Sequence, residues 1–167
     1  MIVVSNATPL IAMAMADQFD LLQRIFGRIY IPQGVYEEVV EEGDERFGAP
    51  DVRQAPWIQV VEVNDRLAVQ VLEDDLGKGE SETIILAKEL QAEWVLVDER
   101  LARRKLELLG VRTIGTLGIL LKAKELGLMQ AVRPEVEKLR ARGFRLGRHV
   151  YEDVLQMAGE SGNVLDR

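Results

Sequence analysis

The sequence predicts an α/β fold with a central parallel sheet of four or five strands and helices on both faces of the sheet. Along the chain, short runs of β-branched and other apolar residues alternate with apolar residues at helical spacing. Strands that alternate with helices are typical of a parallel sheet, because each connection between parallel strands must cross over the sheet. A chain of 167 residues is long enough to bury about two thirds of its unfolded surface. We therefore expect one domain that spans residues 1–167.

The first half of the chain is predicted to supply three strands. They are the apolar or alternating segments 2–4, 29–31 and 57–63. Apolar residues at helical spacing fill the segments between them, at 9–15, at 19–26 and after Pro32. Gly27 is typical of a helix end and Pro32 of a helix start. Residues 43–56 hold two Gly and two Pro and predict a surface loop.

The second half is predicted to supply two more strands, at 94–97 and 111–114. The break LGKG at 76–79 precedes a clear helical pattern over 79–90, and Gly110 ends a helix that begins near Asp98. Further helical patterns cover 67–72, 116–126, 134–142 and 148–158. We therefore expect residues 133–160 to form C-terminal helices of the same domain.

The composition excludes several classes of site. The chain has no Cys, which excludes disulfides, thiolate metal sites and cysteine catalysis. Its one histidine, His149, is too little for a His-rich zinc site or a Ser-His-Asp triad, and we assign it a surface or capping role. No GxGxxG or Walker sequence follows the first strand, which argues against a nucleotide-binding domain.

The net charge is −7, from 28 acidic and 21 basic residues. This balance argues against a broad basic surface for nucleic acid, although a carboxylate cluster that binds divalent cations presents positive charge to a phosphate. No apolar stretch approaches the roughly 20 residues that span a bilayer, and Asn6 and Asp17 fall too early for a signal peptide. We expect a soluble, cytoplasmic protein that does not enter the membrane.

Polar residues stand where the first predicted strand ends. In VVSNATPLI, residues 3–11, a β-branched run stops at Ser5 and a helical pattern follows. Asn6 and Thr8 have two interpretations. They can cap the helix, because Asn and Thr side chains satisfy the free N–H groups of a first turn. Alternatively they mark an active site, since open α/β proteins place their chemistry at the carboxyl ends of strands.

Asp98 and Glu80 occupy comparable positions. Asp98 follows the apolar run 94–97, so it should project from the carboxyl end of a buried strand. Glu80 opens the helix after LGKG and, at about 100° per residue, extends the apolar face of that helix. By the same test Glu82 and Glu89 point to solvent. Glu80 is therefore the unusual carboxylate of this helix.

Glu38 is a third candidate carboxylate. In PQGVYEEVVEE it borders Val35 and Val39 on the apolar face of the predicted helix, whereas Glu37 lies on the far side. Glu38 is therefore the glutamate of this segment that we expect to face the rest of the domain.

Each carboxylate also has a plainer interpretation. Glu38 and Glu80 can be solvated helix residues, with Glu80 favoured by the helix dipole, and Asp98 can cap the helix that follows it. Their occurrence together with Asn6 at the ends of predicted elements favours a common site.

Four stretches of the sequence resemble the PIN domain of VapC-type toxins, and in particular its prokaryotic branch with Asn at the first acidic position. They are VVSNATPLI, IPQGVYEEV, GKGESETIILAKELQAEWVLVDER and GFRLGRHVYEDVLQMAGE. The resemblance implies a PIN-like three-layer α/β/α fold and a metal-dependent ribonuclease. It implies that Mg²⁺ or Mn²⁺ is the cofactor, that Thr8 supports the first acidic position, and that a catalytic, metal-binding quartet is formed by Asn6, Glu38, Glu80 and Asp98.

Asn6 departs from the family pattern, because most active PIN nucleases have Asp at this position. An amide oxygen can still bind Mg²⁺, but the quartet then carries three formal charges in place of four. We therefore expect weaker cation binding and attenuated activity.

The implied enzyme is an endoribonuclease, a hydrolase that cuts RNA phosphodiester bonds and leaves a 3′-hydroxyl and a 5′-phosphate. The resemblance implies the toxin-like member of a toxin–antitoxin pair, with a small antitoxin protein as partner and a homodimer as the assembly. An alternative function, which Asn6 favours, is a catalytically weak or inactive PIN-fold module that binds an antitoxin-like peptide or RNA.

Four basic residues near the predicted site are candidates for RNA contacts: Lys78, Arg100, Arg103 and Arg104. Such side chains can contact the phosphate backbone without reading the base sequence. The alternative is that the arginines pair with Glu99 and Glu107 on the surface of one helix.

Overall fold

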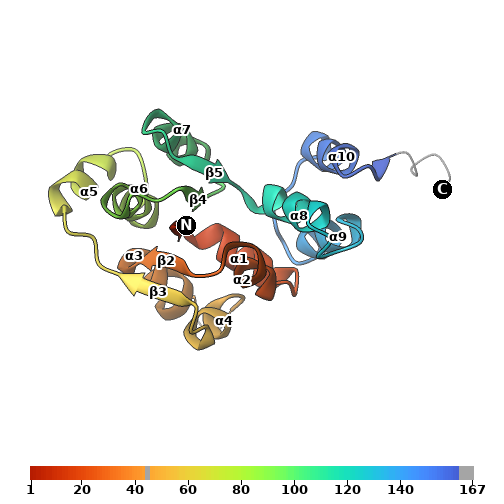
Figure 1. Cartoon of the computed structure of the whole chain (residues 1–167), viewed down its shortest axis with the longest axis horizontal. Helices are drawn as coiled ribbons and strands as arrows, with labels where there is room; N and C mark the ends of the chain where they lie inside the picture. Colours follow the sequence, from red (N-terminus) through yellow and green to blue (C-terminus); the bar gives the residue numbers. More distant parts are fainter. Residues whose placement is uncertain (44–45, 162–167) are drawn as a thin grey trace.

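A computed structural model of the chain describes residues 1–43 and 46–161 (Figure 1). Its centre is a five-stranded sheet in the order β3-β2-β1-β4-β5, and every neighbouring pair is parallel. The strands are β1 (Val3–Ser5), β2 (Ile29–Pro32), β3 (Ile58–Val61), β4 (Trp94–Leu96) and β5 (Arg112–Ile114). The prediction of an α/β fold with a parallel sheet is confirmed.

Helices connect the strands and cover the sheet. The segment after β2 is helical over residues 33–41, where α3 (Gln33–Tyr36) continues directly into a π-helical turn, η1 (Glu37–Glu41). The other helices are α1 (Ala7–Met15), α2 (Asp20–Phe26), α4 (Ala49–Gln54), α5 (Arg66–Leu72), α6 (Lys78–Leu90), α7 (Arg100–Leu108), α8 (Thr116–Glu125), α9 (Arg133–Ala141) and α10 (Arg148–Met157). These bounds agree with most of the predicted helices to within two residues.

The prediction of a surface loop over residues 43–56 is wrong for the second half of that segment. Residues 44–45 lie outside the described residues. Helix α4 occupies 49–54, and Pro50 stands in its first turn. A proline is compatible with a first helical turn, because the N–H it lacks has no partner there in any case. Ala49 and Val52 give the short helix a buried face. Gly48 and Pro50 therefore lie at the start of a helix where we expected a loop.

Alternating strand residues pack into two cores, one on each face of the sheet, as the period of two in a strand requires. Val3 and Leu96 belong to the core that contains α1, α2, α8 and α9. Val4 and Val95 belong to the core that contains parts of α5, α6 and α7. The result is three layers, helices on sheet on helices.

The last three helices pack on the same body as the sheet, and Figure 1 shows them gathered beside α1 at one end of the molecule. Val136 and Leu139 of α9 and Val154 of α10 are buried in the core that contains α1. Glu160, just after α10, accepts hydrogen bonds from the backbone N–H groups of Val132 and Arg133 at 2.7 and 2.9 Å. This carboxylate joins the end of α10 to the start of α9.

Two expectations from composition have structural counterparts. His149 is exposed in the first turn of α10, as the surface assignment requires. In the part of the chain that the structure describes, none of the helices has the length and apolar character needed to cross a membrane.

Candidate active site

Asn6 and Asp98 lie at the same edge of the sheet, because they follow neighbouring parallel strands. Asn6 comes directly after β1, and its backbone N–H donates to the carbonyl oxygen of Leu96 in β4 at 2.9 Å. Asp98 follows Leu96 by two residues. Asn6 is 1% exposed, whereas Asp98 is half-buried. The carboxyl ends of β1 and β4 therefore place one amide and one carboxylate at this edge.

The side chain of Asn6 does not cap α1. Although Asn6 occupies the N-cap position, its side chain accepts no capping hydrogen bond. Instead Asn6 Nδ2 donates to Glu80 Oε2 at 3.3 Å, and Asn6 Oδ1 lies 3.5 Å from Thr83 Oγ1. Thr83 makes a shorter bond, 2.7 Å, to the carbonyl oxygen of Gly79. Asn6 thus joins the end of β1 to the first turns of α6.

Glu38 and Glu80 meet beside Asn6 because Gly79 leaves room for them. A Cβ atom on Gly79 would lie 2.9 Å from Glu38 Oε1 and 3.6 Å from Asn6 Oδ1. Glu80 is half-buried in the first turn of α6, and Glu38 comes from η1. By exposure the order of the two neighbouring glutamates differs from the prediction, because Glu38 is the more open one and Glu37 is half-buried beside Lys78. The role of Glu38 and Glu80 in a common site stays a prediction.

The electrostatics of Glu38 reflect this crowding. Although much of the residue is open to solvent, partial burial of its carboxyl raises its pKa, and the negative charges of Glu80 and Glu42 raise it further. Among the described residues, no side chain or backbone N–H donates a hydrogen bond to Glu38, and no cation pairs with Glu38 or Glu80 within 4 Å. Two like charges therefore lie close together, and within the described residues no cation pairs with either of them.

Asp98 is held by the start of α8, not by the helix that follows it. Thr116 N donates to Asp98 Oδ1 at 2.8 Å, and Thr116 Oγ1 donates to Asp98 Oδ2 at 2.6 Å. The residue that caps α7 is Glu99, which accepts from the backbone N–H groups of Ala102 and Leu101. The interpretation of Asp98 as the cap of α7 is therefore wrong.

Thr116 is a site residue that the sequence analysis missed. It is fully buried, and its two bonds fix both oxygens of Asp98. The signal in the sequence was a Thr that follows the strand-end pair Ile114-Gly115 and opens a helix. Thr8, in contrast, is exposed in the first turn of α1, and none of the hydrogen bonds among the described residues uses its side chain. Its supporting role stays a prediction.

The candidate RNA-contacting cations differ in their pairing. Lys78 Nζ lies 3.1 Å from Glu37 Oε1, and its hydrogen bond is the main reason that the pKa of Glu37 is lowered. Arg100 and Arg104 are exposed and Arg103 is half-buried. None of the ion pairs in the described ranges involves these arginines, so the expected pairing with Glu99 and Glu107 is not seen.

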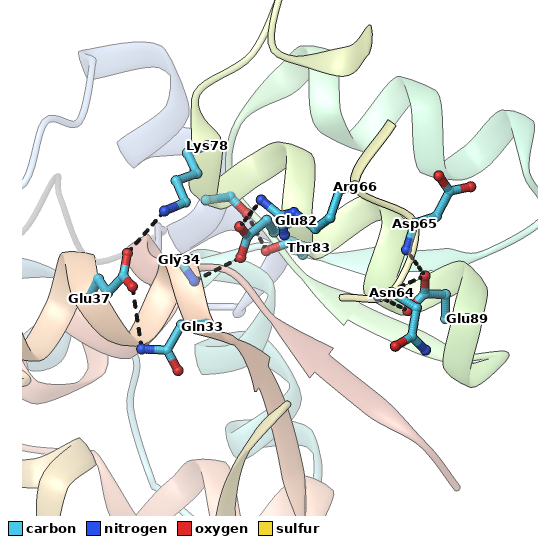
Figure 2. Close-up of polar contacts among 11 residues, drawn as sticks. Gln33, Gly34, Glu37, Asn64, Asp65, Arg66, Lys78, Glu82, Thr83 and Glu89 are labelled. Atoms are coloured by element: carbon cyan, nitrogen blue, oxygen red, sulfur yellow. Dashed lines mark hydrogen bonds and ion pairs between the residues drawn. The ribbon is translucent and has the colours of Figure 1, made fainter. Parts of the chain in front are cut away.

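The structure contradicts the predicted orientation of Glu82. The phase of the apolar face places it toward solvent, yet it is 1% exposed. Figure 2 shows why: Glu82 Oε1 accepts from the backbone N–H of Gly34 at 2.8 Å, and Oε2 accepts from Arg66 at 3.0 Å. The first turns of α6 pack against both α3 and α5, so more than one face of the helix is covered.

The donor set at this edge suits a hard divalent cation. Amide and carboxylate oxygens are the ligands that Mg²⁺ and Mn²⁺ prefer. Glu38 and Glu80 supply two carboxylates, and no cation in the described part of the chain pairs with them. Within residues 1–43 and 46–161, no three His, Cys, Asp or Glu side chains are already gathered as a metal site. The residues therefore fit a cation by their chemistry, and the carboxylates must approach one another when one binds.

Comparison with known proteins identifies the family of the chain. The sequence profile of the PIN domain matches residues 2–160. The chain belongs to the PIN-domain family. A comparison with curated proteins finds no match. The family resemblance predicted from the sequence is thus confirmed over nearly the whole chain, and the PIN domain is a nuclease-type fold whose members typically use divalent metals.

Proposed function

We propose that this PIN domain is a metal-dependent endoribonuclease that hydrolyses RNA phosphodiester bonds. The observation that carries the proposal is the meeting of Asn6, Glu38 and Glu80 around Gly79 at the end of β1. Asp98 stands at the end of the neighbouring strand. A bound cation stabilises two carboxylates beside a buried amide oxygen, and across residues 1–43 and 46–161 no cation pairs with Glu38 or Glu80.

The four residues have distinct tasks in this proposal. Asn6 and Asp98 hold the cation directly, Asn6 through Oδ1 and Asp98 in the orientation that Thr116 imposes. Glu38 and Glu80 act as ligands or through water. Mg²⁺ or Mn²⁺, when bound, supplies charge neutralisation for the phosphate and activation of a water molecule. A carboxylate held by hydrogen bonds, such as that of Asp98, is the usual form of a pre-oriented metal ligand.

Basic residues beside the site are proposed to hold the RNA backbone. Arg103 lies next to Asp98, because a Cβ atom on Gly115 would be 2.7 Å from Asp98 Oδ1 and 3.3 Å from Arg103 Nη1. Arg100 and Arg104 flank it on α7. Lys78 is a weaker candidate, since it must leave Glu37 to reach a phosphate. These contacts are to phosphate and do not select a base sequence.

The proposed biological setting follows from the resemblance to VapC-type toxins. On that basis the protein is the toxin-like member of a toxin–antitoxin pair in the cytoplasm, a homodimer that a small antitoxin protein holds inactive. What supports this setting is the likeness of the four stretches of sequence.

One contact favours a second candidate function, a catalytically weak PIN module that binds an antitoxin-like peptide or RNA. Asn6 Nδ2 donates to Glu80 Oε2, so Asn6 satisfies this carboxylate without a cation. An Asp at position 6 has no N–H to donate and would need a cation between the two groups. With Asn at position 6, the site therefore needs a bound metal ion less than it would with Asp.

The first experiment compares RNA cleavage by the wild type, Asp98→Asn and Glu99→Gln. Each protein is given structured and single-stranded RNAs with Mg²⁺, Mn²⁺ or EDTA. Glu99→Gln is the matched control, because Glu99 is the neighbouring carboxylate but caps α7. We expect cleavage that needs metal, is lost in Asp98→Asn and persists in Glu99→Gln. Failure of the wild type to cleave where another PIN nuclease does would favour the binding module.

A further inference from the structure

The helical segment 33–41 crosses the start of α6 through two matched contacts. At one, Glu82 of α6 lies over Gly34, where a Cβ atom would be 2.9 Å from Glu82 Oε1. At the other, Glu38 lies over Gly79, where a Cβ atom would again be 2.9 Å from the Glu38 carboxylate oxygen. The residue numbers run in opposite directions, 34 with 82 and 38 with 79. The two segments are therefore antiparallel, and each places a glutamate over a glycine of the other.

The two glutamates differ in how their charges are satisfied. Glu82 is buried, and both its oxygens accept hydrogen bonds, one from Gly34 N and one from Arg66 (Figure 2). Glu38 accepts none among the described residues and faces the like charge of Glu80. An ionised carboxylate is stable in a buried place only when it is paired and hydrogen-bonded. Glu82 therefore depends on these two hydrogen bonds, whereas Glu38, much of which is open to solvent, can be hydrated and has no protein donor among the described residues.

We propose that Glu82 is a positioning residue: by binding the N–H of Gly34 it fixes segment 33–41 against α6, and so sets where Glu38 lies relative to Glu80 and Asn6. Gly34 and Glu38 are four residues apart and share a helical face. A shift of the segment at Gly34 is therefore transmitted to Glu38 one turn away. The part of the proposal that concerns metal and RNA rests on the proposed nuclease function; the part that concerns geometry does not.

Two conservative variants separate the effect of the side-chain length of Glu82 from the effect of its charge. Glu82→Gln keeps the side-chain length and an oxygen for Gly34 N, and it removes the charge that Arg66 pairs. Arg66 is 54% exposed in its side chain, so it can turn to water. Glu82→Asp keeps the charge but shortens the side chain by one methylene, which withdraws it from Gly34. A positioning role predicts that Gln substitutes for Glu82 better than Asp does, and a role through charge alone predicts the reverse.

A matched control lies on the same helix. Glu89 accepts hydrogen bonds from the backbone N–H groups of Asn64 and Asp65, at 3.0 and 2.8 Å, and so joins α6 to the chain before α5 (Figure 2). Glu89→Asp removes the same methylene from a carboxylate that also binds backbone N–H groups. Its place is near the other end of α6, away from Glu38.

The geometric test uses the absence of cysteine from this chain. With Glu38→Cys and Glu80→Cys introduced together, the rate of disulfide formation reports how often the two positions meet, because the bond tolerates little variation in geometry. We expect Glu82→Gln to change this rate by less than about threefold and Glu82→Asp to slow it about tenfold or more. Glu89→Asp should leave it unchanged. Equal rates in all four backgrounds, or equal slowing by Glu89→Asp, would overturn the proposal.

A second measurement uses the unmodified site. Calorimetric titration with Mn²⁺ alone should give a dissociation constant about tenfold weaker for Glu82→Asp, and close to that of the wild type for Glu82→Gln and Glu89→Asp. Stronger binding by Glu82→Asp than by Glu82→Gln would mean that Glu82 acts through its charge and would refute positioning. If the wild type binds no Mn²⁺ while disulfide formation still depends on Glu82, positioning stands and the nuclease proposal fails.

Discussion

The side-chain amide of Asn6 donates a hydrogen bond to Glu80 Oε2 across 3.3 Å. This contact links the carboxyl end of β1 to the first turn of α6, and it is a contact that the more usual Asp of a PIN nuclease cannot make. In the proposed quartet, the amide also leaves three formal charges where Asp would give four. If the proposed function is right, Asn6 therefore affects both the stability of the protein without a cation and the affinity of the site for one.

Replacement of Asn6 by Asp should change these two properties in opposite directions. Without divalent cation, Asn6→Asp should lower the free energy of unfolding by about 1 kcal/mol or more, because a hydrogen bond is lost and a repulsion is added. With Mn²⁺, affinity should rise about tenfold, and RNA cleavage should rise with it. Urea unfolding with EDTA and calorimetric titration with Mn²⁺ measure the two effects. Weaker Mn²⁺ binding by Asn6→Asp would mean that Asn6 is not a ligand.

Gly79→Ala should impair the site and leave the fold intact. The new Cβ atom would lie 2.9 Å from Glu38 Oε1, so Glu38 must move away from Asn6. The helix itself should not suffer, because Ala is favoured over Gly in a helix by about 1 kcal/mol. We expect a melting temperature at or above that of the wild type and a loss of metal-dependent cleavage of about tenfold or more.

The control for Gly79→Ala is Gly147→Ala. Gly147 precedes α10, and a Cβ atom there has open space within 4 Å. Its cleavage rate should equal that of the wild type. Unchanged cleavage by Gly79→Ala would show that Glu38 does not need its present place.

The strand ends could be predicted from the sequence, and this is why Asn6 and Asp98 were identified. A buried strand is a short apolar run with a clear end, and the first polar residue after it must lie at the sheet edge. Glu38 and Glu80 were chosen by helical phase, which is a sound guide only where a helix buries one face. Glu38 is nevertheless more exposed than Glu37. The same reasoning misplaced Glu82, because the first turns of α6 are covered on more than one side.

The remaining errors have related causes. Helix α4 does not follow from the sequence pattern, because a proline such as Pro50 is compatible both with a loop and with the first turn of a helix. Thr116 was missed because its partner, Asp98, is 18 residues away in the sequence. Local pattern cannot give the partner of a side chain when the contact depends on the order of strands. The β4 and β5 strands bring these two residues together.

Thr116→Val should separate the orientation of Asp98 from its charge. The variant keeps the shape of Thr116 and removes the hydroxyl that donates to Asp98 Oδ2 at 2.6 Å. The backbone bond from residue 116 to Oδ1 remains, so the carboxylate is free to rotate. We expect a loss of about 1–3 kcal/mol of stability and a fall of about 10- to 100-fold in cleavage and metal affinity, as for other residues that orient a ligand.

Thr116→Ser tests the reason for that effect. It restores the hydroxyl and should restore most of the activity, whereas a purely steric role of the methyl group predicts the opposite ranking. Combined with Asp98→Asn, Thr116→Val should add little further loss of cleavage, because the two residues act as a unit. Full additivity of the two losses would contradict this account.

Glu160 should make stability depend on pH in the acid range. Partial burial acts to raise the pKa of Glu160, but hydrogen bonds from Val132 N and the Lys124 ammonium, together with Arg133 N, outweigh it and hold the pKa below its ordinary value of 4.5. A carboxyl with a depressed pKa in the folded state stabilises the protein fully above its unfolded pKa. That contribution disappears as the pH falls through the lower, folded pKa. Glu160→Gln should therefore lose on the order of 2 kcal/mol near pH 7 and differ less from the wild type below pH about 4.

Glu152→Gln is the matched control on α10, because Glu152 is exposed and its nearest cation, Arg148, lies 3.8 Å away, so its effect should stay within about 0.5 kcal/mol. Urea unfolding of the three proteins across this pH range measures the difference, and a deficit of Glu160→Gln that persists unchanged at the acid end would show that the charge of Glu160 is not what joins α10 to α9.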